Sequence, residues 1–221
     1  MNLTPVGENI STDKLNARLS AVALSEDVAG AILKGHSLEE MLQYCAKSIV
    51  HRLDAALARI WILDNSTNEL ILKASAGLYT HLNGKHASIP FGETAIGCIA
   101  KESTPYIIDD IQHSQLIQDQ DWVSRESLIS FVGYPLLVDD VVIGVMIAFS
   151  RMSLNATTIE AMSSVAKGVG IAVNRAKAQD ELRLSEERYR FLYHRTPVML
   201  YSMDNHGRVI RVSDYWLQVM G

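Results

Sequence analysis

The feature that most constrains this chain is a long helical pattern that runs from residue 153 to about residue 194. A single helix of about 40 residues is about 60 Å long, at ~1.5 Å of rise per residue. Such a helix is too long to cover one small domain, so we expect it to leave one folded unit and lead to another. A stiff connector of this kind suits the transmission of a conformational signal better than the turnover of a substrate.

The apolar side chains of this helix change phase near its middle. The first half has an apolar residue every three or four positions, as a coiled-coil seam does: Ile159, Met162, Ala166, Val169, Val173 and Ala176. The second half continues, slipped by one residue, as Leu182, Ser185, Tyr189 and Leu192. One straight seam cannot serve both halves. We expect the first half to pack on a sheet. The second half is either a two-register connector in a parallel dimer, which we favour, or a poorly packed surface helix.

The composition argues against several classes of partner and location. The 221 residues suffice for one domain of roughly 150 residues and a fragment. The formal net charge of −5 and the lack of a basic cluster argue against nucleic-acid binding. The longest apolar run, residues 141–149, is far shorter than the ~20 residues of a membrane span, and residues 1–5 do not resemble a secretory signal. Two cysteines, Cys45 and Cys98, are too few for a disulfide framework, so we predict a cytoplasmic protein.

The order of the local patterns predicts an α+β domain. A tail over residues 1–12 precedes a helix over residues 13–33, and Gly35 then suits a left-handed cap. Ser37 and Glu40 form a capping box that starts a second helix, over residues 38–53. Short apolar segments predict strands over residues 56–63, 69–76, 106–108, 130–138 and 141–150, and a short helix over 94–101. This order gives an antiparallel β-sheet with helices packed on one side and a long C-terminal connecting helix.

Two details of these elements make specific predictions. The first helix carries one apolar stripe: Leu15, Leu19, Val22, Ala29 and Leu33. Pro135 lies inside a predicted strand, and because proline cannot donate to a ladder we expect an edge or a bulge there. Asp139 and Asp140 form the tight turn between the last two strands.

The stretch from residue 38 to about residue 176 resembles a GAF domain, and more closely the GAF domains of bacterial multidomain sensor kinases. The segments that carry this resemblance are residues 58–63, 74–79, 96–102, 131–136 and 143–151. The resemblance implies the GAF fold, assigned here to residues 13–176. It also implies a small-molecule pocket between the sheet and the irregular segments over it, residues 77–92 and 108–128.

The last part of the chain resembles the opening of a PAS domain. Residues 185–190 and Leu192 resemble its entry helix, residues 197–208 its first hairpin, and residues 216–221 its first short helix. Ser213 stands where that family commonly has asparagine. The resemblance implies a signalling helix over residues 177–194 and the truncated start of a PAS domain over residues 195–221, which is too short to form a PAS pocket.

The residues needed for catalysis are not recognisable in the sequence. None of the seven histidines is followed by the acidic residue and nearby proline of a kinase phosphoacceptor helix. His81 and His86 are five residues apart, but no carboxylate or cysteine completes a metal set, so we expect solvated loop histidines and no metal. GAF relatives that attach linear tetrapyrroles commonly use a cysteine followed by histidine, and neither Cys45 nor Cys98 is. Relatives that reduce methionine sulfoxide need several loop cysteines, whereas both cysteines here lie on predicted helices.

The implied pocket has four candidate wall residues: Trp61, Phe91, Trp122 and Tyr134. A ligand pocket needs apolar walls and a few polar groups, although aromatic side chains bury large areas in any core. Ordinary core packing is therefore the competing explanation for each of them. The sequence does not identify a cofactor.

The leading interpretation is a non-catalytic sensory and dimerisation module of a bacterial signal-transduction protein, such as a sensor histidine kinase. A small molecule or partner would bias the GAF domain, and the long helix would carry that bias to a PAS or output domain. We expect a homodimer formed through the N- and C-terminal helices, without nucleic acid and without a membrane span. Two alternatives remain: a cysteine-based redox enzyme that acts at Cys98, and a structural spacer without a ligand.

Overall fold

The computed structural model describes residues 6–34, 37–195 and 197–220. The chain forms two compact units, residues 1–174 and residues 175–221, and each is described by itself. The predicted cap at Gly35 lies outside the described residues.

The first unit is built on a six-stranded antiparallel sheet with the strand order β3-β2-β1-β6-β5-β4. The strands are β1 (Ala55–Asp64), β2 (Glu69–Gly77), β3 (Ser88–Pro90), β4 (Tyr106–Ile108), β5 (Ser130–Val138) and β6 (Val141–Ser150). Long apolar strands lie at the centre, and three-residue strands lie at both edges. The predicted α+β class and antiparallel sheet are confirmed.

Both faces of this sheet are buried, and alternate side chains belong to different apolar clusters. On β1, Ala58, Ile60 and Ile62 enter one cluster, whereas Leu57 and Trp61 enter the other. Successive side chains of a strand point to opposite faces, so each central strand supplies both clusters. This explains why β1 and β6 read as nearly continuous apolar runs.

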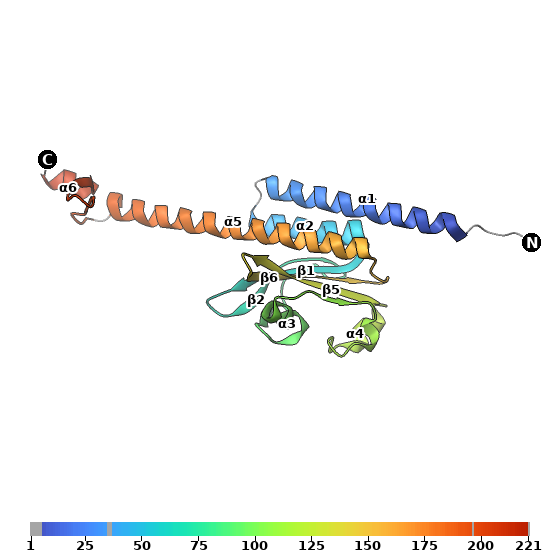
Figure 1. The fold of residues 1–221 in the computed structure, drawn as a ribbon. Helices are drawn as coiled ribbons and strands as arrows, with labels where there is room; N and C mark the ends of the chain where they lie inside the picture. The colour runs from blue at the N-terminus through green and yellow to red at the C-terminus, as the bar shows by residue number, and fades with distance from the viewer. Residues whose placement is uncertain (1–5, 35–36, 196, 221) are drawn as a thin grey trace, which may run out of the picture. The chain divides into compact units, whose positions relative to one another are not determined.

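Two long helices lie on the first face of the sheet, and a third lies outside them (Figure 1). The two are α2 (Leu38–Leu53) and the part of α5 (Ala156–Arg195) that precedes residue 175, and the third is α1 (Val6–Leu33). Met162, Val169 and Val173 of α5 are completely buried against the sheet and its helices, so the predicted packing of this half is confirmed. The capping box of Ser37 and Glu40 is also present at the start of α2.

Short helices cover the second face of the sheet (Figure 1). They are α3 (Thr94–Glu102), the 3-10 helix η1 (Ile111–His113) and α4 (Gln120–Arg125). Ile99, Ile111 and Val123 from these segments are buried in the second apolar cluster. The long helices are therefore gathered on one side, as predicted, while the opposite face is closed by the irregular segments between the strands.

Helix α1 begins earlier than predicted, and the face that it buries is not the apolar stripe found in the sequence. It begins at Val6, whereas the sequence pattern placed its start near residue 13. The residues that pack into the core are Leu24, Val28 and Ala31. The predicted apolar stripe of Leu15, Leu19, Val22, Ala29 and Leu33 is exposed. The helix thus has two apolar faces, and tertiary packing in this unit uses the shorter one.

The turn and proline predictions are correct. Asp139 and Asp140 both adopt positive φ angles, 49° and 63°, which a two-residue hairpin of the mirror-image type requires. β4 pairs with β5 only at residues 131–133, so Pro135 faces no partner strand on that side. A register shift follows at Leu136 and Leu137.

The second unit contains the end of α5, the hairpin of β7 (Tyr201–Met203) and β8 (Val209–Val212), and α6 (Asp214–Met220). Ser213 is fully buried, accepts hydrogen bonds from the N–H groups of Leu200 and Trp216, and donates to the carbonyl of Val198. The hydroxyl of Ser213 therefore caps α6, because it accepts a backbone N–H group of the first turn. Among the described helices of both units, none combines the length and apolar character that crossing a bilayer requires.

Gly77 ends β2 in a conformation that a side chain would disfavour. Its φ is +94°, and a Cβ atom there would collide with the carbonyl oxygen of Ala56. We expect Gly77→Ala to lower the free energy of unfolding by about 2 kcal/mol, as measured by urea denaturation. The matched control is Gly30→Ala in α1, where a Cβ atom meets nothing within 4 Å. This change should stabilise the protein by up to about 1 kcal/mol through helix propensity. Equal effects of the two substitutions would contradict the explanation.

Candidate ligand-binding site

A cavity of about 480 Å³ lies between the second face of the sheet and the segments that cover it. The central strands supply its floor, including Leu57, Trp61, Ile147 and Phe149. Residues 79–96 and 116–125 contribute the other walls. The volume is within the range of about 300–1,000 Å³ that is typical of small-molecule sites. The cavity lies where the sequence resemblance predicted a pocket.

The structure brings together two of the four predicted wall residues. Trp61 and Trp122 line the cavity. Phe91 packs against the same apolar cluster but does not line the cavity. Tyr134 lies on the opposite face, where its hydroxyl donates to the carbonyl of Ile159 at 3.0 Å. Phe131 lies on the cavity side, and Tyr134, an odd number of residues further along β5, points the other way.

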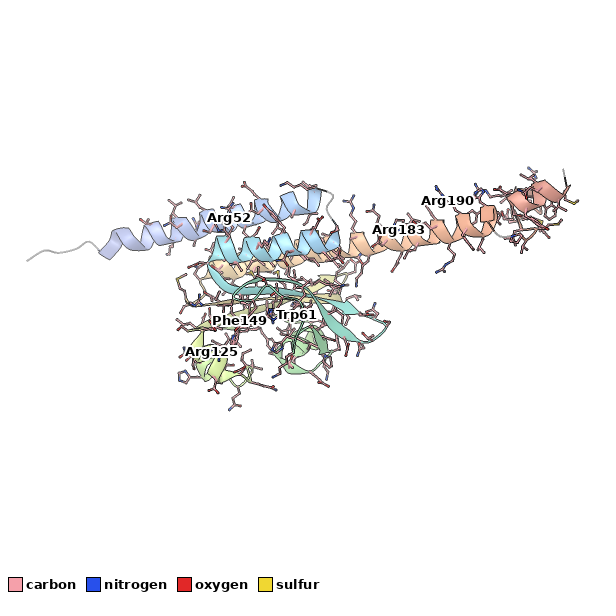
Figure 2. All side chains as sticks on the ribbon, turned by 180° about the vertical axis from the view of Figure 1, so that it is seen from behind. Arg52, Trp61, Arg125, Phe149, Arg183 and Arg190 are labelled. Carbon is pink, nitrogen blue, oxygen red and sulfur yellow. The ribbon has the colours of Figure 1, made fainter. Side chains whose placement is uncertain are left out.

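Aromatic rings form the apolar part of the cavity. Two of the residues that carry them, Trp61 and Phe149, are labelled in Figure 2. The rings of Trp122 and Phe149 meet edge to face, with centroids 5.1 Å apart. Trp122 Nε1 donates to the Tyr79 hydroxyl at 3.2 Å, and Trp61 Nε1 donates to the carbonyl of His86 at 2.9 Å. Both indole N–H groups are thus satisfied by the protein, and their rings offer apolar surface to a ligand.

Arg59 supplies a cationic group at the floor of the cavity. The residue is only 8% exposed, and its Nε donates to Ser75 Oγ at 3.1 Å. Its guanidinium carbon lies 5.9 Å from the centre of the Tyr79 ring. Burial lowers the pKa of Arg59 from its ordinary value. The sequence analysis did not single out this residue as a site, although a lone charge inside the apolar strand of residues 55–63 was a usable signal.

The remaining charged side chains of the cavity are mostly basic. Lys85 and Arg125 line it, and Asp119 is its sole acidic lining residue among the described ones. The Asp119 carboxylate accepts the backbone N–H of Trp122 and so caps α4. Burial lowers the pKa of His86, and the positive charges of Arg59 and Lys85 lower it further. Within the described residues, no group of three or more His, Cys, Asp or Glu side chains is placed to hold a metal.

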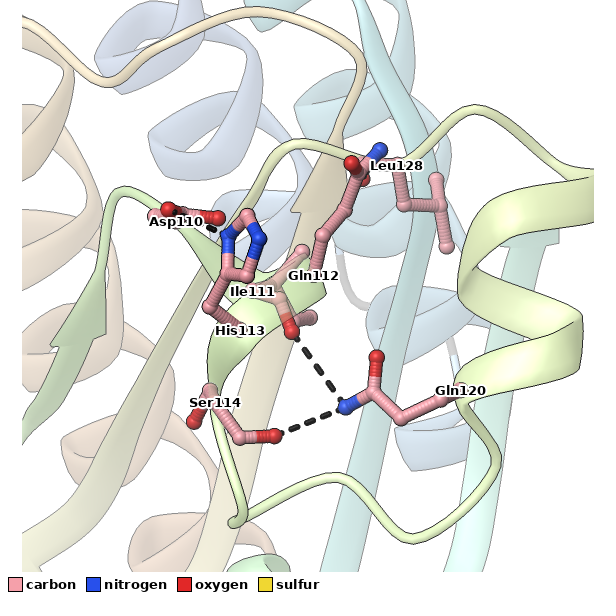
Figure 3. A network of polar contacts seen from close by, with 7 residues as sticks. All are labelled: Asp110, Ile111, Gln112, His113, Ser114, Gln120 and Leu128. Atoms are coloured by element: carbon pink, nitrogen blue, oxygen red, sulfur yellow. Dashed lines mark hydrogen bonds and ion pairs between the residues drawn. The ribbon is translucent and has the colours of Figure 1, made fainter.

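A glutamine side chain fastens the loop that closes one wall of the cavity (Figure 3). Gln120 Nε2 donates to the carbonyls of Ile111, Ser114 and Ile117 at 3.4, 2.7 and 2.9 Å. Its Oε1 is the one buried side-chain polar atom without a partner among the described residues. Because Ile117 lines the cavity, this amide helps to fix the shape of the wall.

The model of the GAF domain family matches residues 35–174. The chain belongs to the GAF domain family. The match covers more than half of the chain, and it contains all six strands of the sheet and the residues that line the cavity.

Solved structures share this GAF fold at low sequence identity. The GAF domain of a phosphoenolpyruvate-protein phosphotransferase from Coxiella burnetii is 17% identical, with a TM-score of 0.66 over 74% of this chain and 98% of that one. A fragment of a methyl-accepting chemotaxis protein is 24% identical, with a TM-score of 0.57 over 69% and 98%. A free methionine-R-sulfoxide reductase from Neisseria meningitidis is 17% identical, with a TM-score of 0.61 over 74% and 93%. No curated protein sequence matches the chain.

The two cysteines of this GAF domain lie on opposite sides of the sheet. Cys45 is completely buried on α2 in the helix-covered cluster. Cys98 lies on α3, a helix that packs into the cluster on the other face, and its Sγ is 3.5 Å from the carbonyl oxygen of Gly92. Thiol-based reduction that regenerates through a disulfide needs a second thiol within reach of the first. With the sheet between them, Cys45 cannot serve Cys98 in this way.

We expect Cys45 to resist alkylation in the folded protein. Burial raises the pKa of its thiol to about 12, so its thiolate population at pH 8 is lower than that of a free thiol by about a thousandfold. In a Cys98→Ser variant, a disulfide reagent such as Ellman's reagent should label no thiol at pH 8 until denaturant is added. A Cys45→Ala variant, which keeps Cys98, is the matched control. Rapid labelling of Cys45 in the native state would contradict its structural role.

The loop contact of Gln120 gives a second prediction. Gln120→Glu would point carboxylate oxygens at three carbonyl oxygens, and it should lower the free energy of unfolding by about 1–3 kcal/mol. Amide hydrogen exchange in residues 111–119 should accelerate selectively. Gln115→Glu, the same change at an exposed position of that loop, should alter stability by less than about 0.5 kcal/mol. Unchanged exchange in the Gln120→Glu variant would mean that the amide does not fasten the loop.

Proposed function

We propose that the chain is a non-catalytic sensory and dimerisation module of a bacterial signal-transduction protein. A small molecule occupies the cavity, and its binding shifts the arrangement of the helices on the opposite face of the sheet. Helix α5 then leads to a PAS domain and an output domain, as in a sensor histidine kinase. A cytoplasmic location is part of this proposal.

The observation that carries the proposal is a continuous set of polar contacts from the cavity to the helical layer. Arg59 at the cavity floor donates to the side chain of Ser75 on β2. The side-chain amide of Gln43 on α2 binds the backbone of the same residue twice, at 2.8 Å to its carbonyl and 3.2 Å from its N–H. Ser75 therefore links Arg59 directly to α2, and a movement of Arg59 is transmitted to the helix through this one residue.

The same helix is tied to α1. Arg52 near the end of α2 pairs with Asp27 of α1, with Nε and Oδ2 2.8 Å apart. The hydrogen bond from Arg52 lowers the pKa of Asp27, because it stabilises the ionised carboxylate. Because α1 presents apolar side chains outward, a shift of α2 changes the surface that a second copy of the chain would meet.

The outer surface of the helical layer supports the homodimer. Leu15, Leu19 and Val22 of α1 are 57%, 60% and 57% exposed, and they recur with a spacing of four and three residues. A shallow groove of about 470 Å³ lies beside them between α1 and α5, and it is lined partly by Ala21, Ala29 and Ala161. Exposed apolar residues at coiled-coil spacing suit pairing with the same helices of a second copy.

The end of α5 fits the role of a connector. Leu182 and Leu192 are 61% and 42% exposed, and they belong to the phase-shifted seam that the sequence predicted. In the second unit, a hairpin over residues 201–212 followed by α6 supports the resemblance to the opening of a PAS domain. A ligand shifts such a connector only if it binds its two arrangements with different affinity.

Two other functions are less well supported. The likeness to methionine sulfoxide reductases is a likeness of fold, and the separation of the two cysteines does not favour the redox mechanism. The redox-enzyme hypothesis predicts that Cys98→Ser abolishes reductase activity. A structural spacer is distinguished from a sensor by a cavity that no small molecule enters.

The dimer is tested by breaking its proposed seam. The double substitution Leu19→Glu and Val22→Glu places like charges on both copies, and it should shift the protein from dimer to monomer in light scattering coupled to size-exclusion chromatography. The folded structure should persist in circular dichroism, because both side chains are exposed. Leu82→Glu in an exposed loop is the control and should remain dimeric. A wild-type monomer at about 100 μM would overturn the proposed dimer.

A further inference from the structure

A buried guanidinium without a carboxylate partner is the least expected group in this fold. Arginine is almost never buried unless it is paired, because the loss of hydration is costly. Arg59 is more than nine-tenths buried, yet within the described residues no Asp or Glu forms an ion pair with it. Among the described residues, its one hydrogen-bond partner is a neutral hydroxyl, and its guanidinium also lies near one aromatic ring. The protein thus keeps a desolvated positive charge in its core without neutralising it.

The unpaired nitrogens of Arg59 are open to the cavity. Nε is used by Ser75, whereas neither terminal nitrogen has a hydrogen-bond partner in the described part of the chain. Among the described residues, Gln120 Oε1 is the one side-chain polar atom that is both buried and without a partner. The unpartnered terminal nitrogens of Arg59 therefore retain some exposed surface. Arg59 lines the cavity, so its two terminal nitrogens offer N–H groups to whatever occupies that space.

The groups around this arginine favour an anion. Asp119 is the one acidic residue among the described lining residues, whereas Lys85 and Arg125 add two positive charges, in a chain whose formal net charge is −5. The Tyr79 hydroxyl accepts from Trp122 and retains its own O–H, which can donate to an oxyanion. Low local dielectric strengthens an ion pair made at this depth.

We propose that the cavity binds a small organic carboxylate. The carboxylate pairs with the terminal nitrogens of Arg59, and the apolar body of the molecule lies against Trp61, Trp122 and Phe149. One guanidinium edge with two donors matches the two oxygens of a carboxylate. A phosphate dianion would need further buried charge, and Lys85 and Arg125 are exposed. This inference deepens the proposed function, since it names the class of ligand for the same cavity.

The test compares acids with neutral molecules of the same shape. The probes are 3-phenylpropionate and indole-3-acetate, their amides 3-phenylpropionamide and indole-3-acetamide, and phenyl phosphate, all at equal ionic strength. Isothermal titration and thermal denaturation give affinity and the shift of Tm. We expect each acid to bind at least about tenfold more tightly than its amide and to raise Tm.

Arginine variants identify the group responsible. Arg59→Met should remove the preference for acid over amide while Tm without ligand is kept or raised, because an unpaired buried charge has been replaced by an apolar side chain. Arg59→Lys should retain part of the preference, since the charge remains without the fork geometry. Lys47→Gln, which removes an exposed charge from α2 and leaves the cavity lining unchanged, should alter the affinity for acids less than about threefold.

Several outcomes would overturn the inference. Amides that bind as tightly as acids, or an acid preference that survives in Arg59→Met, would show that Arg59 does not select the ligand, although an occupied cavity would still support a sensor. Binding of phenyl phosphate about tenfold tighter than the acids would replace carboxylate by phosphate as the class. No binding of any acid up to about 10 mM would also overturn it, whereas the proposed dimeric module is judged independently by light scattering.

Discussion

The alternation of side chains along the central strands is the constraint on which the rest of this structure depends. Each residue of β1 and β6 serves one face only, so the same ten-residue strand supports a helical layer and a ligand-sized cavity. Ile60 packs beneath the helices, and its neighbours Arg59 and Trp61 line the cavity. A shift of the strand by one residue would exchange the two sets and destroy both surfaces together. The cavity and the helical layer therefore depend on the same strands and the same register.

The burial of Arg59 on the cavity side of such a strand calls for an explanation other than stability. An apolar side chain at that position would pack in the core without a desolvated charge, so stability alone does not explain an arginine. Burial lowers the pKa of Arg59, as is expected where a charged group has lost hydration. An anion in the cavity would offset the desolvation penalty of Arg59. This relief would add to the free energy of binding. Functional sites commonly carry such a local cost in stability.

The sequence predicted the elements of the fold well because local patterns determine them. The capping box at Ser37 and the Asp139–Asp140 turn depend on adjacent residues, and both are present. Predictions that depend on long-range packing were weaker. The stripe that begins at Leu15 predicted a helix, but it did not reveal that Leu24 and Val28 form the inner face of α1. Tyr134 was assigned to the pocket by residue type, whereas the pleat of β5 directs it to the helices. Arg59 could have been noticed as the one charged residue inside an apolar strand, but only the structure shows that it is buried without an acidic partner among the described residues.

The size of the signal that this arrangement can carry is limited by its contacts. Gln43 joins α2 to Ser75 by two hydrogen bonds, each with a net contribution of about 0.5–1.5 kcal/mol. If ligand binding made or broke both, the coupling free energy would be about 1–3 kcal/mol, which changes an equilibrium by about 5- to 150-fold. That range can redistribute two helix arrangements of similar energy, but it cannot overcome a large preference for one of them. A sensor built in this way therefore needs a helical layer whose arrangements are nearly balanced. The exposed seam of α1, which the core of its own unit leaves unused, is the surface at which a second copy could set that balance.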